Sequence, residues 1–244
     1  TALVRPILVE RSIISREIPM MLLATAAFCV MGLDRFFGAA VQNLISRGNG
    51  VILLLLFGVF LYYTVTSILL APKAHAADPY VAEVAEHIER KKDLTKTVSL
   101  ALTIGGLAAL VCGGRLTVHA AVKIAQAFAI PEFLIGLTIV SFGTTLPELV
   151  TGILATRRGE GDLAIGNVVG SNIFNLLFIG GTVSLVNPIP IPDGGAADLG
   201  ILILLSALVL PISIRGSRTV TRAEGGLLLA LYLGYLAWRV ATSH

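Results

Sequence analysis

The sequence predicts an all-α integral membrane protein of about seven transmembrane helices, and its composition and its apolar runs carry that prediction. Hydrophobic residues make up 55% of the chain and charged residues only 14%, and the mean hydropathy is +0.87. Soluble domains carry roughly 25% charged residues. The apolar residues come in runs of about 18 or more, long enough to cross the ~30 Å hydrocarbon core as helices. A transmembrane barrel would show alternating segments of about ten residues instead.

Seven apolar spans follow one another along the chain. They are Ile18 to Phe37, Val51 to Leu70, Thr97 to Phe128, Phe133 to Ala155, Leu163 to Val186, Leu199 to Ile214 and Gly226 to Val240. The third span is too long for a simple crossing. Its outer half carries Arg115, His119 and Lys123 four residues apart, on one helix face. We therefore expect one tilted helix that emerges into water or against protein.

The distribution of Lys and Arg predicts the orientation of these spans, because the cytoplasmic side of a membrane protein carries the excess of basic residues. With seven crossings, thirteen of the eighteen basic residues fall on one side. We expect that side, with the chain start and Pro72 to Lys96, to be cytoplasmic in a multi-pass protein of the cell inner (plasma) membrane. These loop residues account for the net charge of +3, so we expect no nucleic-acid partner.

The two cysteines predict neither a disulfide nor a metal site. Cys29 and Cys112 lie inside apolar spans and far apart in the sequence. Cysteine in such positions usually behaves as a small hydrophobic residue. We therefore expect both to be small buried side chains.

A short internal match indicates two copies of one unit. Leu3 to Ile7 and Leu185 to Ile189 are identical at four of five positions, and Arg5 and Asn187 fall on opposite predicted sides, as inverted repeats require. The expected organisation is residues 1–71 as the last two helices of a first repeat, 72–96 as a cytoplasmic linker, and 97–244 as a complete second repeat. The front of the first repeat would then be missing.

The fourth span contains an unusual segment, Ser141-Phe142-Gly143-Thr144-Thr145-Leu146-Pro147-Glu148. Pro147 has no N–H for the carbonyl of Gly143, so the helix must kink or open there. Glu148 places a carboxylate inside the membrane, where an ionised group costs about 2.5–3.5 kcal/mol or more and must face a cavity or a partner. Carboxylate, hydroxyl and carbonyl oxygens are the ligands of hard cations. The segment indicates a cation site; the alternative is a kinked helix with a protonated structural glutamate.

The fifth span is also polar where lipid would select large apolar residues. Ser171 and Asn175 are four residues apart and are expected to share a helix face, while Gly166 and Gly170 form a small-xxx-small pair that lets two helix backbones approach. The alternative interpretation is that the Asn and Ser side chains only bond neighbouring helices.

Two polar segments follow one another in these spans, Gly-Thr-Thr-Leu-Pro-Glu and then Gly-Asn-Val-Val-Gly-Ser-Asn-Ile-Phe-Asn. Together they resemble the α-repeat signature of the cation:calcium antiporters, the sodium/calcium exchanger superfamily, in its bacterial and archaeal form. The resemblance implies a fold of ten helices in two inverted five-helix repeats. This chain would correspond to helices four to ten.

By position, the resemblance makes Glu148 the calcium-ligating glutamate, Thr144 a carbonyl donor and Thr145 a hydroxyl ligand for sodium. Ser141 and Ser171 match positions lining the sodium sites. Asn175 is a departure, because some relatives have Asp there and Asn removes a negative charge. Gly166, Asn167 and Asn172 are expected to serve packing and helix bonding rather than ligation.

The implied activity is alternating-access exchange of sodium for calcium, with the two ions competing for one site in the lipid bilayer. Such exchange involves no covalent step, so we expect the protein to be no enzyme and to need no cofactor. A second glutamate would come from the missing first-repeat segment, which is needed to complete the site. Two alternatives stay open: a proton-coupled cation exchanger, which the neutral Asn175 favours, and a truncated inactive half-transporter or membrane scaffold.

Overall fold

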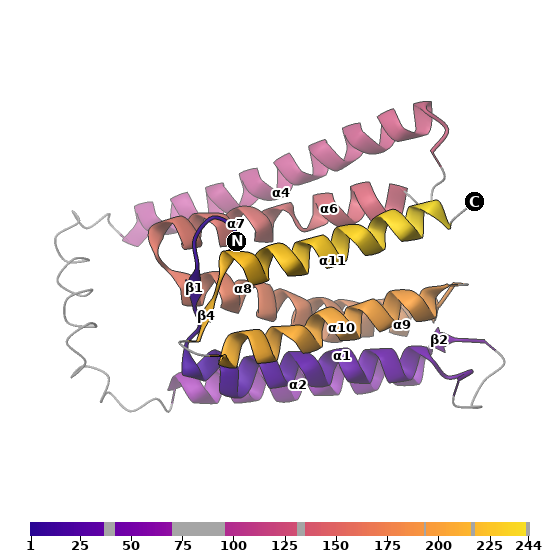
Figure 1. The fold of residues 1–244 in the computed structure, drawn as a ribbon, viewed down its shortest axis with the longest axis horizontal. Coiled ribbons are helices and arrows are strands. Elements are labelled where there is room, and N and C mark those ends of the chain that lie inside the picture. The colour runs from indigo at the N-terminus through magenta and orange to yellow at the C-terminus, as the bar shows by residue number, and fades with distance from the viewer. Residues whose placement is uncertain (37–41, 70–95, 131–134, 193, 216–217, 243–244) are drawn as a thin grey trace. The chain divides into compact units, whose positions relative to one another are not determined.

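The computed structural model describes residues 1–36, 42–69, 96–130, 135–192, 194–215 and 218–242 (Figure 1). The chain divides into two compact units, Thr1–Leu61 with Glu148–His244, and Tyr62–Pro147. The predicted linker 72–96 lies outside the described residues except for Lys96, where helix α4 begins.

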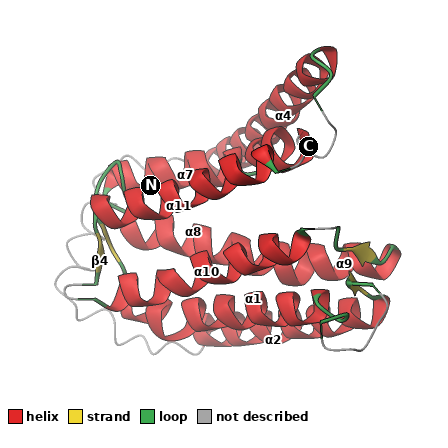
Figure 2. Ribbon diagram, turned by 45° about the vertical axis from the view of Figure 1, so that its right-hand side comes forward, coloured by secondary structure: helices red, strands yellow, loops and turns green. Residues whose placement is uncertain are grey.

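The described parts of all seven predicted spans are helical, apart from turns at residues 33–36, Phe128 and Thr145 (Figure 2). The α-helices of the first unit are α1 (Ile18–Gly32), α2 (Arg47–Leu69), α7 (Leu146–Arg158), α8 (Gly161–Ile173), α9 (Gly180–Val186), α10 (Gly195–Ile214) and α11 (Arg222–Ala241). Of these, α2 and α7 extend into the second unit. The second unit holds α4 (Lys96–Ala127) and α6 (Ser141–Thr144). Within the described ranges, three wider π-helical turns lengthen these elements, namely η1 (Ile13–Glu17), η3 (Ile135–Val140) and η4 (Phe174–Ile179).

Among the described residues, five helical segments are long and apolar enough to cross a membrane. They are Ile13–Gly32, Arg47–Ser67, Thr97–Ala127, Gly161–Val186 and Gly195–Ile214. The bent pair Thr138–Thr144 with Leu146–Arg158 gives a sixth if it counts as one broken span. Helix α11 is 20 residues long but does not meet the same test, so its crossing of the membrane stays a prediction.

Helices α1 and α10 pack closely in the first unit, and Figure 1 draws them side by side. Thr25 donates its hydroxyl to the carbonyl of Met21 at 2.8 Å and contacts the hydroxyl of Ser206 at 3.4 Å. Near the end of α1, a Cβ on Gly32 would lie 3.2 Å from Cδ1 of Leu199. Small side chains and one hydroxyl pair therefore let the two backbones approach, as in other membrane helix contacts.

Two short strand pairs join segments that are far apart in the sequence. β1 (Ile7–Leu8) pairs antiparallel with β4 (Thr219–Val220), and β2 (Leu44–Ile45) pairs antiparallel with β3 (Ile189–Pro190). Ile7 and Ile189 are the last residues of the two matching pentapeptides, and each begins a strand. The equivalent use of the two segments supports the proposal that they belong to repeated units.

The helix that follows each partner strand begins in the same way. Ser46, directly after β2, accepts the N–H of Asn49 at 3.2 Å. Thr221, directly after β4, accepts the N–H of Glu224 at 3.3 Å. A hydroxyl at this position satisfies one of the backbone donors left free at a helix start. The chain thus repeats a strand, a capping hydroxyl and a helix.

The predicted single long helix of the third span is confirmed by the 32 residues of α4. Arg115, His119 and Lys123 are all exposed on it. The expectation for the cysteines is confirmed for Cys29, which is buried, and wrong for Cys112, which is exposed. Hydropathy identifies an apolar span, but it does not show which faces of the helix pack against other parts of the protein. Cys112 lies on a face of α4 that is left exposed.

Candidate functional site

The predicted helix break is present and falls at Thr145. Helix α6 ends at Thr144, Thr145 has φ −92° and ψ −2°, and α7 begins at Leu146. Pro147 is the second residue of α7, a place where its missing N–H costs no helical hydrogen bond. Thr145 lies in the sparsely populated bridge region of backbone conformation, where many active-site residues are found. The backbone of Thr145 and the missing N–H of Pro147 therefore fix where the helix breaks.

The two threonine hydroxyls at the break turn back onto the backbone. Thr144 donates to the carbonyls of Val140 and Ser141, both at 3.0 Å. Thr145 also donates to the carbonyl of Ser141. A hydroxyl that donates its proton elsewhere keeps oxygen lone pairs for another partner. Ser141, Thr144 and Thr145 are exposed, so their oxygens are accessible to a cation.

Gly143 lies in α6 between these hydroxyl residues, and it is buried against α4. A Cβ on Gly143 would overlap Cγ2 of Val118, which no real side chain tolerates. A Cβ on Gly114 would be 3.7 Å from the carbonyl oxygen of Gly143. Glycine at position 143 therefore has a packing role that its flexibility alone did not predict.

Glu148 is the third residue of α7 and is half-buried. Its Oε2 atom is fully buried and has no hydrogen-bond partner among the described residues. A buried polar oxygen without a partner is costly, and an ionised carboxylate costs more. A bound cation would supply the missing interaction.

One side chain of α8 reaches the same turn of α7. Asn167 donates its side-chain amide to the backbone carbonyl of Glu148 at 3.1 Å. Asn172 donates to the carbonyl of Val168 in its own helix at 2.8 Å. Asn167 therefore bonds to a neighbouring helix, as expected, whereas the bond of Asn172 stays within α8. The partner of Asn167 could not be read from the sequence, which shows only that a polar residue lies in an apolar span.

The remaining predicted ligands lie on α8 and η4. Ser171 is half-buried and donates its hydroxyl to the carbonyl of Val168 at 3.1 Å. Asn175 is exposed within η4. The predicted common face assumed a regular α-helix, but the π-helical turn begins at Phe174, between the two residues. Such turns are frequent at functional sites, and no sequence signal indicated this one.

The structure thus shows the six predicted ligands in two groups. Ser141, Thr144 and Thr145 are held by one helix end in the second unit, and Glu148, Ser171 and Asn175 belong to the first unit. Among the described residues, no three side chains of His, Cys, Asp or Glu gather as a metal cluster.

A second buried polar group, which the sequence reasoning missed, joins α10 to α11. Arg239 is only 8% exposed and contacts Asp198 through its Nε at 3.1 Å. Tyr235 donates its hydroxyl to the same carboxylate. Gly194, with φ +81°, lies against the guanidinium, where a Cβ would be 3.1 Å from its nitrogens. Ionisable residues in two apolar helices were the available signal, because such residues seek each other in membranes.

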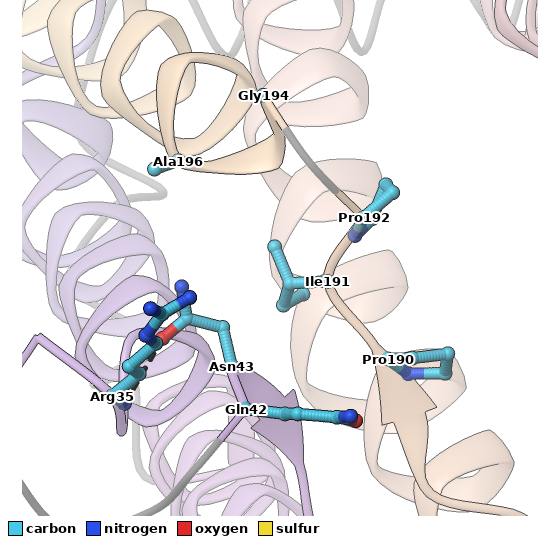
Figure 3. Close-up of a pocket in the computed structure, with 8 residues that line it drawn as sticks. All are labelled: Arg35, Gln42, Asn43, Pro190, Ile191, Pro192, Gly194 and Ala196. Carbon is cyan, nitrogen blue, oxygen red and sulfur yellow. Dashed lines mark hydrogen bonds between the residues drawn. The ribbon is translucent and has the colours of Figure 1, made fainter.

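A cavity of about 400 Å³ lies near the strand pair of β2 and β3 (Figure 3). Its described lining consists of Arg35, Gln42, Asn43, Pro190, Ile191, Pro192, Gly194 and Ala196. Asn43 accepts the backbone N–H of Arg35 at 2.9 Å. None of the six predicted ligands is among these residues, so the cavity is separate from the candidate cation site.

Comparisons with known proteins agree with this chemistry. The family described as "Sodium/calcium exchanger protein" matches residues 1–66 and 98–241. The chain is 36% identical over 240 residues to the "Putative antiporter CaxA" of Alkalimonas amylolytica, with 96% of this chain and 70% of that protein covered. It is 33% identical over 243 residues to the "Inner membrane protein YrbG" of Escherichia coli (strain K12), covering 97% and 69%.

A solved structure of the sodium-calcium exchanger NCX_Mj, soaked with Na⁺ and Sr²⁺, matches the fold with a TM-score of 0.71 and 31% identity. The match covers 97% of this chain and 69% of that one. The predicted fold class is confirmed, and family membership implies cation binding. The chain therefore belongs to the sodium/calcium exchanger family and is a multi-pass membrane ion antiporter, a transporter rather than an enzyme.

Proposed function

We propose that this protein exchanges sodium for calcium across the membrane by alternating access, with Glu148 as the carboxylate ligand that this chain supplies. The buried, unpartnered Oε2 of Glu148 is the observation that carries the proposal. A carboxylate oxygen in this condition is either protonated or paired with a cation. Its position directly after a helix break favours the cation.

The other proposed ligands complete an oxygen-rich set of the kind that Na⁺ and Ca²⁺ prefer. Thr144 would offer its backbone carbonyl, and Thr145 its hydroxyl oxygen. Ser141, Ser171 and Asn175 would line the sodium positions. The hydroxyls of Thr145 and Ser171 donate their protons to backbone carbonyls, which supports a ligand role because their lone pairs then remain available.

Coupling would follow from competition for these oxygens. Both ions would bind the same oxygens, so occupancy by one ion would exclude the other. Sodium moving down its gradient would then drive calcium in the opposite direction when the site opens alternately to the two sides. Asn175 adds no charge to the set, and Glu148 is the carboxylate among the six.

The proposal extends to where the protein acts and to what completes its site. One relative is named an inner membrane protein, and we propose the same membrane for this chain. We also propose that a first-repeat segment supplies further ligands, including a second carboxylate. Experiments on the site therefore need the full-length protein.

The test measures calcium-45 uptake into proteoliposomes loaded with sodium, using the full-length protein and its Glu148→Gln variant. Glutamine keeps the size of the side chain and removes its charge. We expect sodium-dependent uptake to fall to background in this variant. Glu160→Gln is the matched control, because Glu160 is an exposed residue that directly precedes α8 and makes no side-chain capping bond, and it should leave uptake unchanged.

The same assay distinguishes the alternatives. Uptake that ignores the sodium gradient and follows a pH gradient would replace the sodium-coupled proposal with the proton-coupled exchanger, which the neutral Asn175 favours. Uptake that persists in Glu148→Gln would remove Glu148 from the site. No uptake of any cation by intact protein would support a scaffold.

A further inference from the structure

The amide of Asn167 is bonded to the backbone of the residue that carries the proposed cation-binding carboxylate. Its Nδ2 donates to the carbonyl oxygen of Glu148 at 3.1 Å, and both residues belong to the first compact unit. The bond links the middle of α8 to the first turn of α7. It contacts the backbone of Glu148 and leaves the carboxylate free.

The first turn of α7 has fewer backbone hydrogen bonds than the interior of a helix. A helix start lacks intrahelical partners for its first N–H groups, and Pro147 has no N–H at all. The residue before α7, Thr145, is in the bridge region and interrupts the helix. The position of the Glu148 carboxylate therefore depends on contacts from outside α7, and the bond from Asn167 is such a contact.

The same side chain relates Glu148 to another proposed ligand. Asn167 and Ser171 are four residues apart in α8 and so share a helix face. A contact that directs Asn167 towards α7 directs the face that carries Ser171 towards it as well. Ser171 donates its proton to Val168, which leaves its oxygen lone pairs for a cation.

We infer that Asn167 is a positioning residue, which sets the register between the carboxylate of Glu148 and the hydroxyl of Ser171 without touching the ion. The inference rests on the proposed function of Glu148. A role in stability alone would make Asn167 equivalent to any helix-bonding amide. A positioning role predicts that replacing Asn167 changes the affinity of the site for the cation.

Asn172 provides the matched control within the same helix. Its amide donates to Val168 one turn back in α8 at 2.8 Å, so its replacement removes an amide of equal size without removing a bond to α7. Asn167→Asp provides a second test at the first position. Aspartate has the shape of asparagine but donates no hydrogen bond when ionised.

The experiment measures sodium-dependent calcium-45 uptake against calcium concentration for the full-length protein in liposomes. For Asn167→Ala we expect the apparent KM for calcium to rise about two- to tenfold, the range that one net hydrogen bond allows. The maximal rate per folded protein should stay within about twofold. Asn167→Asp should raise KM at least as much, and Asn172→Ala should leave it unchanged.

Folded protein is counted from the monodisperse gel-filtration peak, and Glu148→Gln is measured in parallel. An unchanged KM in both Asn167 variants, or an equal KM change in Asn172→Ala, would overturn the inference. If Asn167→Ala does not fold, Asn167→Asp decides the matter by the same criterion. Persistent uptake in Glu148→Gln would instead show that the proposed site itself is wrong, which separates that failure from a failure of Asn167 alone.

Discussion

Gly143 and Val118 are in direct contact between α6 and α4: a Cβ on the glycine would overlap Cγ2 of the valine and would lie 3.4 Å from its Cβ. Valine is stiff about χ1, so the nearer methyl group cannot rotate away easily. The contact holds the short helix α6, which carries Ser141 and Thr144, against the long helix of the same unit.

Gly143→Ala should therefore destabilise the protein, because the added methyl group overpacks this contact. Overpacking of this kind costs about 1–3 kcal/mol. Thermal unfolding in detergent measures the effect. Gly113→Ala in α4 is the control, because nothing lies within 4 Å of a Cβ at that position. An equal loss in both variants would contradict the packing role of Gly143.

The ion pair of Arg239 with Asp198 predicts a large stability effect. Arg239→Gln leaves the Asp198 carboxylate without its cation, and breaking a buried pair by removing one partner costs about 3–5 kcal/mol. The double variant with Asp198→Asn should lose less than the sum of the two single variants, since neither charge is then stranded. Chemical denaturation of the four proteins measures this cycle.

Arg158→Gln is the control for that cycle. Arg158 is exposed at the end of α7, and surface substitutions of this kind usually stay within about 0.5 kcal/mol. Additive losses at positions 198 and 239 would show that the two residues do not stabilise each other.

The capping box of α11 predicts a dependence of stability on pH. The backbone N–H and the hydroxyl of Thr221 both donate to Glu224, each at 2.8 Å. The backbone bond first, and then the side-chain bond, lower the pKa of Glu224 below its ordinary value of 4.5. The stabilisation is fully present above the unfolded pKa and is lost as pH falls through the lower folded pKa.

Thr221→Ala should lower stability near neutral pH by about 1 kcal/mol, the usual cost of a lost cap. It should also reduce part of the loss of stability below about pH 4.5. Alanine removes the hydroxyl bond to Glu224 and keeps the backbone bond, so the pKa of Glu224 returns only part of the way towards its unfolded value. Thermal unfolding between pH 3 and 7 measures both effects. A profile that keeps its full acid limb in Thr221→Ala would assign that limb to the backbone bond or to other carboxylates, and not to the hydroxyl of Thr221.

The sequence predicted those parts of the fold that depend on one segment at a time. A run of apolar residues must form a helix in lipid because its backbone groups find no other partners, and α4 confirms this for its full length. Pro147 cannot continue the helix that precedes it, because it has no N–H for the carbonyl of Gly143, and the break at Thr145 confirms that. Glu148 and Asn167 were found because polar residues are costly in an apolar span.

The candidate site was predicted as a set of residue types, and its geometry was not. The sequence indicated that Asn167 would bond to a helix but not that its partner would be the carbonyl of Glu148. It placed Ser171 and Asn175 on one face, and the π-helical turn η4 changes the spacing between them. It treated Cys112 as buried, although α4 leaves that residue exposed.

The sequence by itself determined the membrane character of the protein, the positions of its helices, the break before Glu148 and the residues that can supply oxygens to a cation. These follow from run length, from the missing N–H of proline and from the cost of charge in lipid. Only the tertiary structure decided the bond from Asn167 to Glu148, the contact of Gly143 with Val118 and the pairing of Arg239 with Asp198. Each joins residues distant in the chain, and its energy depends on how whole helices pack.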